Sequence, residues 1–256
     1  MSILKELNNG VLTLTFNRPD VLNSINRETA LSLQEALDEA SNNKEVRAVL
    51  ITGSGRGFCA GQDLAEATDP SAKIDTFVRE HYNPIVLKIR SIEKPVIAAV
   101  NGVAAGAGAN LAFCCDLVFA GKSSSFIQSF VNIGLIPDSG GTFFLPRIIG
   151  MQKATALMFT GEKISSEEAE RLGLIYKVVD DTELLNEAFK LAARLAQMPT
   201  AGIGYTKRLL NASYNNDLKE QLDMEEEMQL KAGNSYDYSE GVRAFLEKRK
   251  PVFKGE

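Results

Sequence analysis

Two glycine-rich segments, each placed directly after a short apolar run, are the sequence feature that most restricts the fold. The first, residues 53–64, follows the run 47–52, and the second, residues 101–110, follows the run 95–100. Apolar runs of this length, bounded by turn residues, are typical of buried strands. Glycines let the backbone approach a ligand closely, and helix N-termini beyond them offer free N–H groups to negative charge. The pattern predicts strand-turn-helix units whose turns meet a ligand.

Further strands and helices are predicted in the same part of the chain. Alternating apolar and Thr residues predict a strand at 11–16, and a helix follows at 27–40 with Asn26 as its N-cap. Residues 117–120 and 175–179 are two more expected strands. Because alternating strands and helices form parallel sheets joined by crossover helices, the fold class is predicted to be α/β.

The last part of the chain has a helical pattern without strands. Helices are expected at 184–196, 199–212, 216–231 and 239–248. Helices that have no sheet of their own must pack their apolar faces on the core or on another subunit. We therefore expect a core, residues 1–198, and a C-terminal helical segment, residues 199–256.

Charge and cysteine content argue against several classes of protein. The formal net charge is −5 and no long run of Lys and Arg occurs, so no nucleic-acid partner is expected. The three cysteines, Cys59, Cys114 and Cys115, lack C-x-x-C spacing, which favours packing roles in a reducing cytosol over disulfides or zinc ligation. No run of roughly 18 apolar residues is present to span a membrane. A cytoplasmic location without a membrane partner is expected.

Familiar nucleotide motifs do not explain the glycine-rich segments. Gly106 and Gly108 would begin a dinucleotide fingerprint, but position 111, where the third glycine belongs, is Leu. Neither segment ends in Gly-Lys-Ser/Thr, as a phosphate-binding P-loop does. Isolated glycines usually serve tight turns or close helix packing, and this interpretation stays open for the segments considered alone.

Histidine content limits nucleophilic and metal chemistry. His81 is the single histidine, in a stretch with a helical pattern at 76–89, so a Ser-His-Asp triad would have to use it. No G-x-S-x-G sequence occurs, and a lone histidine on a helix is more often a packing or surface residue. His81 is left unassigned, with lining of the substrate pocket as its alternative, and no metal site is expected.

Asp138 is the remaining candidate for acid-base chemistry. It lies in Gly134-Leu-Ile-Pro-Asp-Ser-Gly-Gly-Thr142, where Pro-Asp-Ser-Gly is turn chemistry and Asp can cap a following helix. An inward-facing carboxylate in an apolar cavity could equally act as a base. Apolar neighbours in the sequence that favour such a cavity are Phe126, Phe130, Ile133, Leu135 and Ile136. Both interpretations stay open on local grounds.

Several motifs together resemble the crotonase superfamily over essentially the whole chain. They are Phe16-Asn-Arg-Pro19, Asn23-Ser-Ile-Asn26, Gly57-Phe-Cys-Ala-Gly-Gln-Asp-Leu64, Lys94-Pro-Val-Ile-Ala-Ala-Val-Asn-Gly102, Gly106 to Asn110, Asp116, Gly140-Gly-Thr142 and Ala244-Phe-Leu-Glu-Lys-Arg249. The resemblance implies a core of repeated ββα units followed by helices, and assembly as a homotrimer or hexamer. It also implies an acyl-coenzyme A substrate, with coenzyme A as part of the substrate and no separate cofactor.

The same resemblance gives the two glycine-rich segments one purpose. In the superfamily, one backbone N–H from each segment holds the thioester carbonyl oxygen as it becomes an enolate, and here these would be the N–H groups of Gln62 and Ala107. Removal of one comparable donor costs on the order of 3 kcal/mol of transition-state stabilisation. The resemblance further places Ala60, Asp63 and Leu64 beside the nucleotide end of coenzyme A. The resemblance also implies that Phe245 and Lys248 reach the ligand of a neighbouring subunit.

Departures from the superfamily pattern indicate which reaction to expect. Hydratases carry two glutamates, and this chain has Asn110 and Phe130 at those places. Without both carboxylates, water addition lacks its acid and base. Asp138 stands where several isomerases and dehalogenases of the superfamily keep an aspartate, and the absence of Trp from this chain counts against the dehalogenases. An isomerase with Asp138 as acid and base is therefore expected.

Within the superfamily the chain is most similar to the ring-1,2-epoxyphenylacetyl-CoA isomerases of phenylacetate catabolism. The segments that carry this likeness are residues 56–63, 82–84, 102–109 and 134–138. It implies conversion of an epoxide thioester to an oxepin thioester. A broader 3-enoyl to 2-enoyl-CoA isomerase and a noncatalytic thioester-binding component that associates with other pathway enzymes remain as alternatives.

Overall fold

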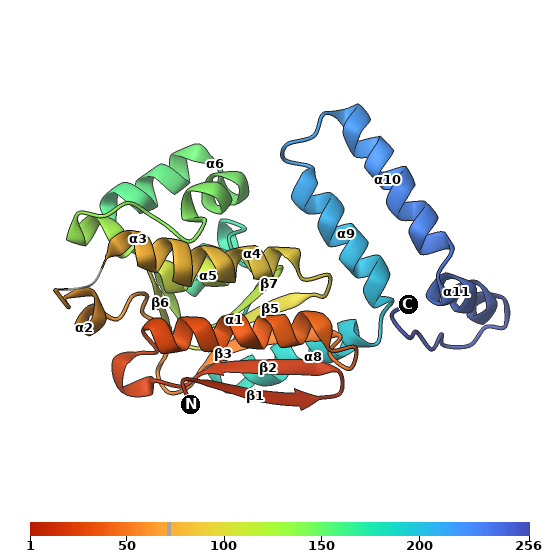
Figure 1. The fold of residues 1–256 in the computed structure, drawn as a ribbon, viewed down its shortest axis with the longest axis horizontal. Coiled ribbons are helices and arrows are strands. Elements are labelled where there is room, and N and C mark those ends of the chain that lie inside the picture. The colour runs from red at the N-terminus through yellow and green to blue at the C-terminus, as the bar shows by residue number, and fades with distance from the viewer. Residues whose placement is uncertain (71–72) are drawn as a thin grey trace.

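A six-stranded sheet is the largest sheet of the protein, and Figure 1 shows several of its strands, from β1 at the lower border to β5 and β7. The computed structural model describes residues 1–70 and 73–256. The strand order is β1-β2-β3-β5-β7-β10, with β1 antiparallel to β2 and the remaining neighbours parallel. The bounds are β1 Ile3–Asn8, β2 Val11–Phe16, β3 Ala48–Gly53, β5 Val96–Val100, β7 Leu117–Gly121 and β10 Lys177–Val179. The predicted strands are confirmed, although β10 begins two residues later than expected.

A second sheet of short strands lies beside the first. Its order is β4-β6-β8-β9, with β4 at Gly57–Cys59, β6 at Val103–Ala105, β8 at Ser125–Ile127 and β9 at Lys163–Ser165. Each of β3, β5 and β7 is followed in the chain by a strand of this sheet and then by helix. The predicted core of repeated ββα units is therefore confirmed. The individual short strands were not predicted, because three residues are too few to show a period.

Helices cover both faces of the large sheet, since successive strand residues point to opposite sides. Val49 and Ile51 of β3 join the cluster beneath α1 and α4, whereas Ala48 and Leu50 join the cluster beneath α8. The helices of the core are α1 Arg27–Asn42, α2 Leu64–Ala67, α3 Ile74–Thr76, α4 Asn83–Ser91, α5 Ala107–Phe113, α6 Gly141–Thr160, α7 Ser166–Arg171 and α8 Leu184–Ala196. Asn26 caps α1 as predicted, accepting a hydrogen bond from the Thr29 N–H at 3.0 Å.

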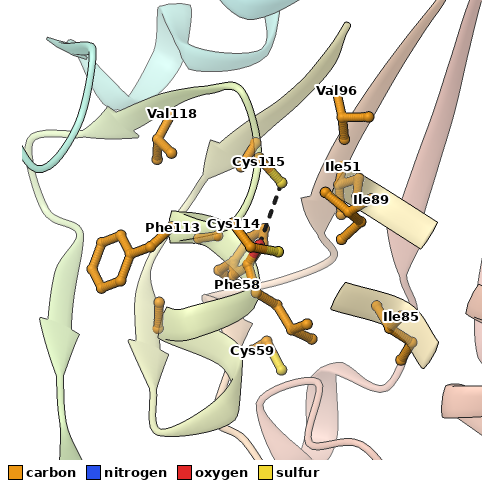
Figure 2. Packing of buried hydrophobic residues seen from close by; sticks show 14 of the residues in the cluster. Ile51, Phe58, Cys59, Ile85, Ile89, Val96, Phe113, Cys114, Cys115 and Val118 are labelled. Carbon is orange, nitrogen blue, oxygen red and sulfur yellow. Dashed lines mark hydrogen bonds between the residues drawn. The ribbon is translucent and has the colours of Figure 1, made fainter. Parts of the chain in front are cut away.

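Shorter elements complete the core. They are the 3-10 helices η1 Pro19–Val21, η3 Ser129–Ile133 and η4 Asp181–Glu183, and the π-helix η2 Phe77–Tyr82. Figure 2 shows the three cysteines among apolar side chains of the larger cluster. All three thiols are free and buried, which confirms their predicted packing role.

Three helices form the C-terminal segment: α9 Thr200–Ala212, α10 Leu218–Gly233 and α11 Tyr236–Leu246. Figure 1 shows α10 and α11 at one end of the molecule, away from both sheets. The predicted helices are confirmed, but α11 begins at Tyr236 because the hydroxyl of Ser235 accepts the Tyr238 N–H at 3.0 Å. Within residues 1–70 and 73–256, no helix is both long and apolar enough to cross a membrane.

Candidate active site

The two glycine-rich segments contact each other at their backbones. A Cβ atom on Gly108, near the start of α5, would lie 2.2 Å from the carbonyl oxygen of Cys59. Gly61 has φ of +89°, and a Cβ there would lie 3.5 Å from the backbone nitrogen of Ala107. Both positions therefore need glycine, one for space and one for its left-handed backbone. The amide of Asn101 joins the segments further, accepting from the Gly53 N–H at 3.2 Å.

Two backbone N–H groups are left free where the segments meet. Ile25 donates to the oxygen of Gly61 at 2.7 Å and accepts from the Asp63 N–H at 2.9 Å, so the intervening N–H of Gln62 points away from Ile25. Ala107 is the first residue of α5, where helical N–H groups lack intrahelical acceptors. Neither N–H has an acceptor in the part of the chain that the structure describes. Such donors can stabilise negative charge on a carbonyl oxygen.

The turn that carries Asp138 packs against the first turn of α5. The backbone oxygen of Asp138 accepts from the Gly141 N–H at 2.9 Å and from the side chain of Asn110 at 2.8 Å. Ser139 has φ of +51°, and Gly140, with φ of +77°, is the N-cap of α6. Because Gly140 occupies the cap position, the alternative in which the Asp138 side chain caps the helix is wrong. Its carboxylate instead accepts from the Ser139 hydroxyl at 2.8 Å.

The environment of Asp138 suits a base. Burial raises the pKa of its carboxyl above the ordinary value, and the hydrogen bond from Ser139 opposes this rise. A carboxylate whose pKa is raised accepts a proton more readily than an exposed one. The start of α5 therefore bonds the turn that carries the Asp138 carboxylate and also presents the free N–H of Ala107.

The apolar surroundings expected for Asp138 are only partly present within this chain. Phe126 and Phe130 are buried, but Ile133, Leu135 and Ile136 are exposed. The reason is that the loop from η3 to α6 runs over the surface of the chain. The Phe130 ring packs against the start of α5, 3.7 Å from the place of a Cβ on Gly106.

Two residues beside Gln62 were not assigned a role from the sequence. The hydroxyl of Tyr82, a buried side chain in η2, donates to Oε1 of Gln62 at 2.8 Å. Gln62 in turn donates to Oε2 of Glu66 at 2.9 Å. Burial raises the pKa of Tyr82, and the nearby carboxylates of Asp138 and Glu66 raise it further. The Tyr82-Asn-Pro sequence carries no periodic signal for this contact.

His81 is buried, with its ring 5.4 Å from that of Phe77. Neither imidazole nitrogen has a partner among the residues described. Burial lowers the pKa of His81, so the ring is neutral at physiological pH. Within the same described residues, no three His, Cys, Asp or Glu side chains gather where they could hold a metal ion.

The residues predicted to border coenzyme A lie at the beginning of α2. Ala60 is half-buried and Leu64 is exposed. Asp63 is 8% exposed, since its carboxylate accepts from the Ala65 N–H at 3.0 Å and forms an ion pair with Arg18 at 2.7 Å. Asp63 therefore holds the shape of this turn.

Phe245 and Lys248 do not join the site of their own chain. Phe245 belongs to α11 and is 83% exposed, and Lys248 is also exposed. Figure 1 shows α11 at the opposite end of the molecule from α2. Any contact of these residues with a ligand would have to involve another subunit.

Comparison with known proteins shows which family the chain belongs to. The model for Enoyl-CoA hydratase/isomerase matches residues 6–256. The chain belongs to the enoyl-CoA hydratase/isomerase family. This family assignment agrees with the crotonase resemblance of the sequence motifs, and it makes the protein an enzyme of that family.

Relatives of this family member include isomerases and hydratases. The chain is 47% identical to the 1,2-epoxyphenylacetyl-CoA isomerase of Escherichia coli (strain K12), over 99% of this chain and 98% of that protein. It is 37% identical to the trans-2-decenoyl-[acyl-carrier-protein] isomerase of Streptococcus mutans, over 99% and 98%. The crystal structure of an enoyl-CoA hydratase from Bacillus anthracis matches with a TM-score of 0.94 and 32% identity, covering 100% of both chains. The fold is thus the crotonase fold.

Proposed function

We propose that this enzyme isomerises ring-1,2-epoxyphenylacetyl-CoA to the oxepin thioester. The observation that carries the proposal is the placement of Asp138. Its turn is bonded to the same helix start that offers the Ala107 N–H, and its carboxylate is free of the helix cap. The 47% identity to an epoxyphenylacetyl-CoA isomerase supports the choice of substrate.

The proposed reaction moves one proton within the substrate. The carboxylate of Asp138 removes a proton from the carbon next to the thioester, and the electron pair of that C–H bond moves onto the thioester oxygen. The N–H groups of Gln62 and Ala107 hold this oxygen as an enolate. The C–C bond shared by the epoxide and the six-membered ring breaks, and its electron pair, together with those of the two ring double bonds, forms the double bonds of the seven-membered ring. Asp138 then returns the proton at a ring carbon, so substrate and product have the same formula. Coenzyme A serves as part of the substrate, and the proposal requires no separate cofactor.

Hydration is not favoured by the groups around Asp138. Asn110 is completely buried, and both ends of its amide are used within the protein. Phe130 offers an aromatic ring and no acid or base. Water addition needs a pair of groups that activate water and deliver a proton, and Asp138 alone would have to do both.

A second candidate is isomerisation of linear 3-enoyl thioesters to 2-enoyl thioesters. It is favoured by the 37% identity to a trans-2-decenoyl-[acyl-carrier-protein] isomerase. The same base and oxyanion donors would serve this double-bond shift. Comparison of kcat/KM for the epoxide and for linear 3-enoyl-CoA decides between the two substrates, and a clear preference for linear thioesters would displace the first proposal.

The proposal also includes the oligomeric state of the protein and its cellular location. We propose a cytoplasmic homotrimer or hexamer formed through residues 199–256, with Phe245 and Lys248 reaching the ligand of a neighbouring subunit. The exposed apolar side chains of α10 and α11 support an assembled state. Ala60, Asp63 and Leu64 are proposed to border coenzyme A, and association with other enzymes of the pathway is part of the same proposal.

Substitution of Asp138 tests the proposed function. A general base contributes about 10²–10⁴-fold to rate, so Asp138→Asn is expected to reduce turnover of epoxyphenylacetyl-CoA by that factor. Turnover is followed by chromatography of the thioesters, with exchange of the α-proton in deuterated water as a second readout. Near-normal turnover by a correctly folded variant would remove Asp138 from the mechanism. Binding of coenzyme A thioesters by the unmodified protein without α-proton exchange would favour a noncatalytic component.

A further inference from the structure

Asn110 links three separate segments through one buried side chain. Its Nδ2 donates to the backbone oxygen of Asp138 at 2.8 Å, and its Oδ1 accepts from Nε2 of Gln128 at 2.8 Å. Asn110 lies in the first turn of α5, Gln128 directly follows β8, and Asp138 precedes α6. Asn110 is 0% exposed and Gln128 is 3% exposed, so neither bond competes with bulk water.

We propose that Gln128 and Asn110 are positioning residues, which act as a relay of hydrogen bonds that fixes Asp138 relative to the oxyanion donors. The proposal rests on the proposed function, in which Asp138 is the base. Asn110 follows Ala107 by three residues in the same helix, and residues at this spacing lie on one face of the helix. The side chain that holds the base is therefore attached to the helical turn that presents the Ala107 N–H.

The direction of the relay follows from hydrogen-bond chemistry. A backbone oxygen can only accept, so Asn110 must turn its NH2 group toward Asp138 and its oxygen toward Gln128. The donation from Gln128 Nε2 to that oxygen holds Asn110 in this orientation. If the Gln128 donor is removed, the Asn110 amide keeps only its bond to the Asp138 oxygen, so its orientation is held less firmly.

The Asp138 turn needs such a support because its backbone is strained. Ser139, next to the base, has φ of +51°, a left-handed conformation that is unfavourable for residues other than glycine. Residues of this kind persist when the surrounding contacts hold them in place. The bonds from Asn110 and from the Gly141 N–H both end on the carbonyl oxygen between Asp138 and Ser139. Loss of the Asn110 bond leaves the strained turn with one of its two backbone supports.

Apolar substitutions of similar shape test the relay without adding charge. In Gln128→Met and Asn110→Leu, kcat for the isomerisation is expected to fall by about 10-fold to 10²-fold, since small displacements of a reacting group reduce rate on this scale. KM is expected to change less than about 3-fold, because neither side chain is proposed to touch the substrate. The control is Asn211→Ala in α9, which removes bonds of the Asn211 side chain with Arg90 and should leave kcat unchanged.

A double-mutant cycle shows whether the effect passes through Asp138. In an Asp138→Asn background, Gln128→Met is expected to cause no further loss of rate, since residues that act as a unit are not additive. An undiminished kcat for folded Gln128→Met, or a full additional loss in the Asp138→Asn background, would overturn the relay. If Asn110→Leu fails to fold, Gln128→Met decides alone.

The outcome is distinguishable from failure of the proposed function. Activity retained by Asp138→Asn would contradict the role of Asp138 itself. An inactive Asp138→Asn combined with normal Gln128→Met and Asn110→Leu would contradict the relay alone.

Discussion

The core and the C-terminal helices keep their shape by different means. Both apolar clusters are built from residues 3–196, and among the described residues of the C-terminal segment the buried apolar side chains are Met228 and Ala244. Large apolar side chains of that segment are exposed instead, Phe245 and Leu246 among them. The core is therefore a close-packed structure that carries the site, whereas the C-terminal helices present much of their apolar surface outward.

Polar contacts attach the C-terminal segment to the core. The ammonium of Lys207 in α9 donates to the Ile89 oxygen at 2.7 Å and pairs with Asp116 at 2.8 Å. Burial lowers the pKa of Lys207, and the charge of Asp116 opposes that change. Arg47 donates to the oxygen of Phe253 at 2.8 Å, which holds the chain end. Substitutions in the core and in the C-terminal segment should therefore have unlike consequences.

A matched pair of glycine substitutions, one in the core and one in the C-terminal segment, should differ most in melting temperature. In Gly108→Ala the new methyl group meets the Cys59 oxygen, and overpacking of this kind costs about 1–3 kcal/mol or more. We expect a lower melting temperature and loss of isomerase activity. Gly233→Ala, at the end of α10, meets no atom within 4 Å and should stabilise by up to about 1 kcal/mol. Equal melting temperatures for the two variants would contradict the difference in packing between the core and the C-terminal segment.

Substitution of exposed apolar residues should affect assembly more than folding. The double variant Phe245→Ser with Leu246→Ser is expected to change the free energy of unfolding by about 0.5 kcal/mol or less per site, measured where the chain is monomeric. Sedimentation should show a shift toward smaller species if α11 contributes to the proposed trimer. An unmodified protein that remains monomeric at micromolar concentration would refute the assembly and the proposed roles of Phe245 and Lys248.

Removal of the Ser139 hydroxyl should produce the smallest effect, confined to pH dependence. The hydroxyl lowers the pKa of Asp138 against the effect of burial, so Ser139→Ala raises that pKa. Because the base must be ionised, the acidic limb of kcat/KM is expected to move to higher pH, with little change on the plateau. Ser213→Ala, beyond α9, is the control. A limb that stays in place or moves to lower pH would contradict the assignment.

Much of the architecture could be predicted from the sequence because its signals are local. The Asn26 cap, the strand at 11–16 and the helices after residue 184 each follow from a short pattern, and the structure confirms them. Of the two interpretations of the glycine-rich segments, close packing is borne out by the contact between Gly108 and Cys59, whereas approach to a ligand stays a prediction. The residues from which these features were predicted are neighbours in the chain.

Contacts between segments that are distant in the chain could not be predicted from the sequence. The hydrogen bond of Tyr82 to Gln62 joins residues 20 apart, and that of Asn110 to Asp138 joins residues 28 apart. Neither has a periodic pattern, because each depends on how the segments pack. For the same reason, local turn chemistry left Asp138 open between helix cap and base until the position of Gly140 was known.

The most direct test of the account compares two reactions of the unmodified protein. Initial rates are measured for isomerisation of epoxyphenylacetyl-CoA and for water addition to crotonyl-CoA, at equal enzyme concentration and pH. With one carboxylate at Asp138 and a fully engaged amide at Asn110, isomerisation is expected at ordinary enzymatic rates and hydration far below them. Hydration of crotonyl-CoA at about 10 per second or faster, a typical enzymatic turnover, would contradict the account.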